Sequence, residues 1–126
     1  GQIQMMMDSI TASLPHIQSK RVRALGISTA KPFPLAPTIP TIATTVPGFE
    51  GNTWQGLCAP AGTPRPVVDR LNAEAMRILR TQDVRDRLNA QGAEPSPLPT
   101  DEFAAFVNRE VEKWAKVVAA TGMRAD

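Results

Sequence analysis

The first half of the chain alternates short apolar runs with polar interruptions. A largely apolar run over residues 3–7 predicts a buried strand that ends at Asp8. Apolar side chains then recur at spacings of four and three, which favours one face of a short helix: Ile10, Leu14 and Ile17. Pro15 falls inside that helix and lacks a backbone donor, so we expect a kinked or very short helix. A second strand is predicted over residues 22–28.

The second half has the periodicity of helices. A strand candidate, residues 53–59, ends in a turn at residues 60–62. Three helices are then predicted: one capped by Thr63, one over residues 81–91 that Gly92 ends, and one that starts at the cap Thr100 and ends at Gly122. Strands followed by helices give an α/β composition in which the two kinds of element are segregated.

A proline-rich segment, residues 31–51, connects the second and third strand candidates. Its five prolines favour extended or turn backbone and deny donors to a sheet. It also contains too many apolar side chains for a flexible spacer: Phe33, Leu35, Ile39, Ile42, Val46 and Phe49. We therefore expect a structured connection that packs along a surface.

Composition limits the class of protein. The length of 126 residues suits about one domain, which excludes an enzyme with separate cofactor and substrate domains. Hydrophobic residues make up 42% and charged residues 21%, as in ordinary globular chains, so neither a disordered tail nor a rod is expected. No stretch approaches the roughly 20 apolar residues of a membrane span, and no signal peptide is recognisable. The start at Gly1, without methionine, suggests a processed or truncated product.

Charge argues against nucleic acid as a partner. The net charge is +2, and the charges do not form the basic stripe that a phosphate backbone requires. Four basic and two acidic side chains precede Thr63, and ten of each follow, so the second half resembles solvated helix faces.

The residue types of enzymes and metal sites are sparse. Cys58 and His16 are the only cysteine and the only histidine, and they could form a nucleophile and base if the fold brought them together. Cys58 lies in an apolar run, which favours an inert buried thiol, and no convergent set of metal ligands is evident. We expect no catalysis and no cofactor.

Two short segments could contribute to a binding site. Asp8 and Ser9 follow an apolar strand candidate, where α/β proteins place ligands, although a carboxylate there is also a common helix cap. Asn52 and Thr53 precede Trp54 after a glycine, which could wall a small polar pocket, although a tryptophan in a strand is more often part of a core.

Three blocks resemble the C-terminal part of the Bug-type extracytoplasmic solute receptors, the periplasmic components of the tripartite tricarboxylate transporter family. The blocks are GQIQMMMDSITASLPHIQSKRVRALGISTAK from Gly1, PTIPTIATTVPGFEGNTWQGLCAPAGTPRPVVDRLNAE from Pro37, and TQDVRDRLNAQGAEP with the later TDEFAAFVNREVEKW. Together they cover nearly the whole chain. The block that contains WQGLCAPAGTP is the most specific of them.

The resemblance implies part of a two-lobed, type II periplasmic-binding-protein fold that closes by a hinge motion on a small carboxylate or amino acid. Residues 1–56 would form part of the second lobe, and residues 57–126 would cross the hinge and pack on the first. Asp8 matches the strand-end aspartate beside the family's cleft, with Ser9 next to it. Asn52, Thr53 and Trp54 match the segment that approaches the cleft.

By the same resemblance the protein would be a non-catalytic periplasmic receptor that delivers its solute to membrane permease subunits. Family members are longer than this chain, so it would lack much of the first lobe and expose apolar faces. We therefore expect an intertwined or domain-swapped homodimer if the chain folds alone. The alternative is a truncated remnant that binds no solute and acts only as a dimerising structural module.

Overall fold

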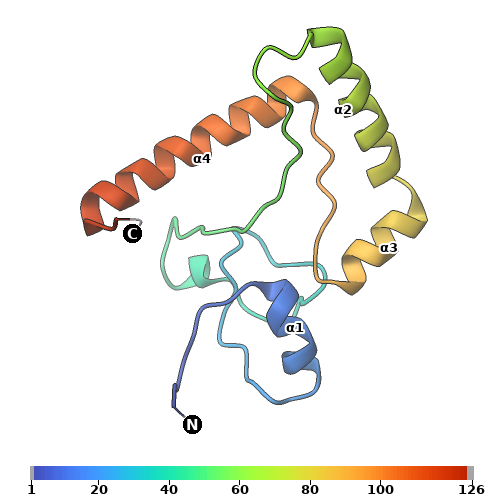
Figure 1. The fold of residues 1–126 in the computed structure, drawn as a ribbon. Helices are drawn as coiled ribbons and strands as arrows, with labels where there is room; N and C mark the ends of the chain where they lie inside the picture. Colours follow the sequence, from blue (N-terminus) through green and yellow to red (C-terminus); the bar gives the residue numbers. More distant parts are fainter. Residues whose placement is uncertain (1, 125–126) are drawn as a thin grey trace. The chain divides into compact units, whose positions relative to one another are not determined.

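The computed structural model describes residues 2–124, and its regular elements are helical (Figure 1). In chain order they are α1 (Ile10–Gln18), the 3-10 turn η1 (Ile42–Thr44), α2 (Arg65–Leu79), α3 (Gln82–Ala90) and α4 (Thr100–Thr121). The chain divides into two compact units. The first combines Gly1–Cys58 with Gln82–Pro95, and the second combines Ala59–Thr81 with Ser96–Asp126.

The three predicted strands are absent from the described residues. Residues 3–7, 22–28 and 53–59 are extended or irregular, and their only β pairing is an isolated parallel bridge between Ile27 and Thr41. Ile27 donates to the carbonyl of Pro40 at 2.9 Å, and Ile42 donates to the carbonyl of Ile27 at 2.9 Å. Apolar composition can mark a strand, but a sheet also needs neighbouring strands to satisfy its backbone groups.

The first unit has its core where the proline-rich segment meets α1. The buried side chains are Leu14, Ile27, Phe33, Ala36 and Ile39. The segment was predicted to pack along a surface, and it does more than this, because it supplies three of these five core residues.

Two successive turns explain why the prolines are compatible with a core. Ala36 donates to the carbonyl of Phe33 at 3.0 Å, and Ile39 donates to the carbonyl of Ala36 at 3.1 Å. Pro34 and Pro37 therefore occupy the second position of each turn, where their fixed φ is favourable and no donor is lost. Each turn advances the chain by three residues, so Phe33, Ala36 and Ile39 return to the same buried side.

Helix α1 is short, as its proline predicted, and its C-terminal end is closed by a left-handed residue. Lys20 has φ 58°. Its amide donates to the carbonyl of Ile17 at 3.0 Å, and the amide of Arg21 donates to the carbonyl of His16 at 2.9 Å. This pair of bonds is a Schellman motif, which usually has glycine at the left-handed position.

Gly92 follows α3 and lies against α1, within the first unit. This glycine ends α3 as predicted, with φ +74°, and it is buried against α1. A Cβ built on it would lie 3.3 Å from the Cα of Thr11 and 3.4 Å from a methyl carbon of Leu14. The backbone of the turn after α3 therefore packs directly on α1.

The second unit consists of α2, α4 and the segments that precede them. Pro64 and Pro99, rather than the predicted Thr63 and Thr100, occupy the N-cap positions of α2 and α4. The hydroxyl of Thr63 donates instead to the carbonyl of Pro60 at 2.8 Å, within the turn that leads into α2. Helix α4 ends at Gly122, as predicted. Within the described part of the chain, the helices are too short or too polar to cross a bilayer.

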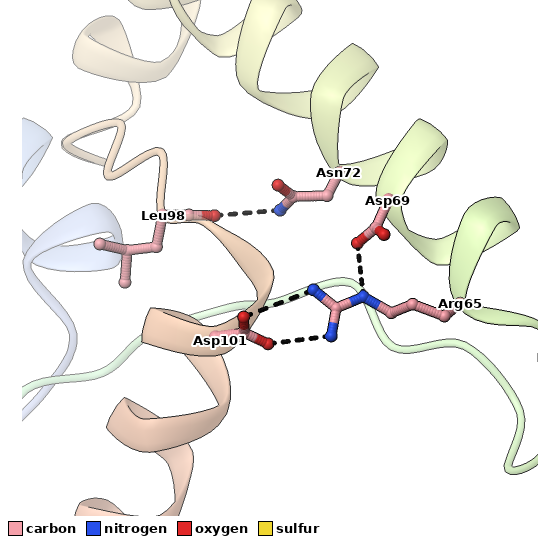
Figure 2. Close-up of polar contacts among 5 residues, drawn as sticks. All are labelled: Arg65, Asp69, Asn72, Leu98 and Asp101. Carbon is pink, nitrogen blue, oxygen red and sulfur yellow. Dashed lines mark hydrogen bonds and ion pairs between the residues drawn. The ribbon is translucent and has the colours of Figure 1, made fainter.

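Polar contacts join the beginnings of α2 and α4 (Figure 2). The guanidinium of Arg65 donates to Asp69 at 2.7 Å and to both carboxylate oxygens of Asp101 at 3.1 and 3.4 Å. The amide of Asn72 donates to the carbonyl of Leu98 at 3.0 Å. These contacts raise the pKa of Arg65, through the hydrogen bond to Asp69 first and the one to Asp101 second. Because these charged groups are paired with one another, we assign them a role in orienting the helices.

Candidate functional site

Asp8 and Ser9 lie together at the N-terminal end of α1. One carboxylate oxygen of Asp8 accepts a hydrogen bond from the amide of Ser9 at 2.8 Å, and the other accepts one from the hydroxyl of Ser13 at 3.1 Å. The hydroxyl of Ser9 accepts from the amide of Ala12 at 3.4 Å, which makes Ser9 the N-cap. A carboxylate at this position also complements the positive end of the helix. Asp8 therefore has the structural role at a helix terminus that was the alternative interpretation of its sequence position.

The Asp8 carboxylate keeps capacity for a further donor. It is exposed, and an ionised carboxylate has about four acceptor sites, of which the two contacts to Ser9 and Ser13 use only part. An incoming hydroxyl or ammonium group could donate to the remaining sites. A second carboxylate would be repelled.

Asn52 has one satisfied and one unsatisfied polar atom. Its amide nitrogen donates to Glu50 at 2.9 Å. Its amide oxygen is buried and has no hydrogen-bond partner among the described residues. A buried acceptor without a donor is rare and is destabilising by about 1–3 kcal/mol, so a ligand, a water molecule or a small rearrangement that supplied a donor would be favourable.

Thr53 and Trp54 follow Asn52 in the same extended segment. Thr53 is exposed, and 41% of the surface of Trp54 is accessible. Trp54 is therefore outside the buried core. The Asp8 carboxylate accepts hydrogen bonds from Ser9 and Ser13 at the start of α1, whereas the amide of Asn52 donates to Glu50 in its own segment.

Cys58 corrects a prediction. It is a free thiol at the surface rather than a buried one, because the expected strand around it does not form. His16 lies in the last turn of α1, where its carbonyl accepts the hydrogen bonds of the turn that follows. Within the described residues no group of three or more His, Cys, Asp or Glu side chains could hold a metal ion.

A second surface feature, at the C-terminal end of α1, was missed by the sequence analysis. A depression of about 550 Å³ is lined by cationic side chains and by apolar ones: Lys20, Arg21 and Arg23, with Ile17, Val22, Ala24, Thr38 and Ile39. The charges of the chain are dispersed as a whole, but three of the four basic residues before Thr63 lie within positions 20–23. A count over the entire chain hides this local cluster.

Comparison with protein families identifies the chain. Residues 1–123 match the family model described as "Tripartite tricarboxylate transporter family receptor". The chain belongs to this receptor family. The resemblance inferred from the three sequence blocks is thus confirmed, and the match extends through the helical second half.

Curated relatives are similar over the whole receptor chain. It is 39% identical over 128 residues to the "UPF0065 protein in tcbD-tcbE intergenic region" of Pseudomonas sp. (strain P51), a match that covers 100% of this chain and 38% of the relative. It is 31% identical over 125 residues to "Protein BugT" of Bordetella pertussis (strain Tohama I), covering 98% of this chain and 38% of that protein. The chain thus spans well under half the length of these two relatives.

Solved structures confirm the fold class. "R. palustris Rpa4515 with adipate" superposes with a TM-score of 0.83 at 32% identity, over 97% of this chain and 41% of that one. "Structure of periplasmic binding protein BugD" gives 0.75 at 30% identity, over 90% of this chain and 39% of that one. The receptor chain therefore has the fold of part of a periplasmic binding protein, although its described residues carry no sheet of their own.

Proposed function

We propose that the receptor chain contributes to the periplasmic solute-binding component of a tripartite tricarboxylate-type transporter, which binds a small carboxylate or amino acid without catalysis. The observation that carries the proposal is the similarity to the structure "R. palustris Rpa4515 with adipate", at a TM-score of 0.83 over 97% of this chain, beside the similarity to periplasmic binding protein BugD. In this proposal Asp8, Ser9, Asn52, Thr53 and Trp54 form this chain's share of the ligand site. Membrane permease subunits receive the solute.

Two features of the first unit support these site residues. The Asp8 carboxylate is exposed and has acceptor capacity left, and the amide oxygen of Asn52 is buried without a donor. A carboxylic acid substrate that also bears a hydroxyl or ammonium group would supply donors to both. Trp54, with 41% of its surface accessible, would cover an apolar part of such a ligand.

The residue assignment of the two lobes follows the same proposal. Residues 1–56 would belong to the second lobe, and residues 57–126 would cross the hinge toward the first. The compact units are cut differently, since residues 82–95 join the first unit. The compact units group the segments by their contacts within this chain, whereas the lobes are assigned by resemblance to the family. The lobe assignment therefore stays a proposal.

Thermal unfolding with added ligand tests the proposal. We would use adipate, a tricarboxylate and an amino acid, each over a range of concentrations. A ligand at 100 times its dissociation constant stabilises the folded state by about 2.7 kcal/mol, which raises the unfolding midpoint by several degrees in a chain of this size. A concentration-dependent rise with one member of the panel supports solute binding, and a flat midpoint with all of them contradicts it.

A second candidate function is favoured by a specific observation. Ile3, Met5 and Met7 have 67%, 75% and 74% of their surface exposed, and exposed apolar segments often mark an interface. The chain would then be a dimerising structural module that binds no solute. A flat midpoint with every ligand, combined with a stable dimer in solution, would favour this module over the receptor role.

A further inference from the structure

The net charge of the chain is localised. Before Thr63 there are four basic and two acidic residues, whereas the remainder has ten of each, so the whole excess of +2 arises in the first half. Three of the four cations there are Lys20, Arg21 and Arg23. The segment that follows α1 therefore carries most of the positive charge of the first half.

These three cations have no carboxylate partner within the described part of the chain. The ion pairs of the structure involve other cations, namely Arg65, Arg77, Arg87 and Lys113. The two carboxylates of the first 58 residues are engaged elsewhere. Asp8 binds Ser9 and Ser13 at the opposite end of α1, and Glu50 accepts from Asn52. Among the described residues, no ion pair therefore occupies Lys20, Arg21 or Arg23.

Cationic and apolar residues line the same depression. The three cations line this depression of about 550 Å³ together with Ile17, Ala24 and Ile39, which are half-buried or buried. The same depression thus offers both positive charge and apolar contact. A ligand that matches both features needs carboxylates beside an apolar side chain.

One of the three cations, Lys20, has an unfavourable backbone conformation. Lys20 is the only residue other than glycine with positive φ in the described part of the chain, at 58°. The turn is closed by Arg21 and Val22, whose amides donate to the carbonyl of His16 at 2.9 and 3.4 Å. Strain at a non-glycine residue often accompanies a functional site.

Stabilisation of the helix end accounts for only part of the cluster. Cations near the C-terminal end of a helix interact favourably with its dipole, but this effect falls off within the last turn. Lys20 and Arg21 are close enough to benefit. Arg23 lies four residues beyond the C-cap Ser19, so the helix dipole does not explain it.

We propose that the depression lined by Lys20, Arg21 and Arg23 is a docking site for an acidic, partly apolar segment of a partner protein. Single ion pairs at an exposed surface are weak, so a small anion would bind poorly, whereas a segment with several carboxylates engages all three cations at once. A nucleic acid requires a longer basic stripe, and anionic membranes are typically bound by clusters of four to eight cations. Binding here is separate from solute binding, because Asp8 lies at the other end of α1, about 13 Å away along the helix axis.

Fluorescence anisotropy with a labelled peptide of alternating Glu and Leu residues tests this site on the 126-residue chain. We expect saturable binding that weakens as salt is raised. The double substitution Arg21→Gln with Arg23→Gln should lower the affinity about tenfold, since it removes two surface ion pairs. Circular dichroism would verify that the variants remain folded.

A matched control removes the same charge elsewhere. Arg70→Gln with Arg80→Gln affects two exposed cations of α2 and its C-cap. This pair should leave peptide affinity unchanged. Equal losses in both double variants would show attraction to net charge alone and would overturn the site, as would the absence of binding. Tighter binding of a DNA duplex or of phosphatidylserine vesicles than of the peptide would overturn the choice of a protein segment.

Discussion

At the scale of single residues, Asp8 combines a structural contact with a proposed binding role. Its two carboxylate oxygens hold the amide of Ser9 and the hydroxyl of Ser13, so any substitution also perturbs the start of α1. A test of binding must therefore separate ligand affinity from helix stability. Ser13 offers that separation, because it contacts Asp8 without being one of the proposed ligand residues.

Asp8→Ala should weaken binding of a carboxylate ligand that bears a hydroxyl or ammonium group about tenfold, and weaken binding of a plain dicarboxylate less. An ionised Asp accepts hydrogen bonds from such donors, at about 1.5–3 kcal/mol each, and repels a second carboxylate. Isothermal titration with matched ligand pairs measures the difference. Ser13→Ala should lower stability without altering this ligand preference, and equal losses for both ligand types in Asp8→Ala would contradict the role.

Lys20 illustrates a residue whose backbone conformation opposes its side-chain type. A non-glycine residue in the left-handed region costs about 1–2 kcal/mol, while glycine loses more backbone entropy on folding. Lys20→Gly should therefore raise the free energy of unfolding by about 0.5–1 kcal/mol. Gln18→Gly, within the last turn of α1, should lower it by about 1 kcal/mol. Urea denaturation of both variants decides the matter, and destabilisation by Lys20→Gly would be inconsistent with strain at this position.

At the scale of elements, the packing of the turn after α3 on α1 depends on a single missing side chain. Gly92 has a left-handed backbone, and a Cβ there would lie 3.3 Å from the backbone of α1. Gly92→Ala should lower the free energy of unfolding by about 2 kcal/mol, from the left-handed conformation and from crowding together.

Gly122 provides the control for that substitution. It has a similar φ of +68° at the end of α4, but nothing lies within 4 Å of a Cβ built on it. Gly122→Ala should therefore cost only the conformational part, about 1 kcal/mol. Denaturant unfolding that found equal losses at the two glycines would show that the turn at Gly92 does not pack closely on α1.

At the scale of the whole molecule, apolar side chains remain exposed on a chain that spans 38% of its relatives from Pseudomonas and Bordetella. The run from Ile3 to Met7 is the clearest case, with three methionines between 62% and 75% accessible. Sheet pairing would cover such a run, and a second copy of the chain is one source of that pairing.

We expect static light scattering at micromolar concentration to give twice the chain mass of 13.6 kDa. Met5→Gln with Met7→Gln should shift the population toward monomer, because it removes apolar surface from the contact. Met123→Gln, at another exposed methionine, should have no effect. A compact monomer of the unsubstituted chain would contradict the dimer.

The sequence by itself determined the local elements whose signals are complete within a few residues. Helical spacing and terminal glycines placed α1, α2, α3 and α4 close to their observed bounds, although the caps predicted for α2 and α4 were wrong by one residue. The sequence blocks also indicated the family, which the match over residues 1–123 confirms. The proline-rich segment was correctly expected to be structured, because its apolar side chains outnumber those of a flexible linker.

Only the tertiary structure decided the features that depend on distant partners. The apolar runs at residues 3–7 and 53–59 have the composition of strands, but a strand forms only where another chain segment accepts its hydrogen bonds. Because the strand predicted around Cys58 does not form, its thiol is exposed. The amide oxygen of Asn52, just before this run, has no donor among the described residues. Burial of Phe33, Ala36 and Ile39 arose from turns that bring them against Leu14 and Ile27. Local propensity determines how a few residues bend, whereas burial and pairing are properties of contacts between segments far apart in the chain.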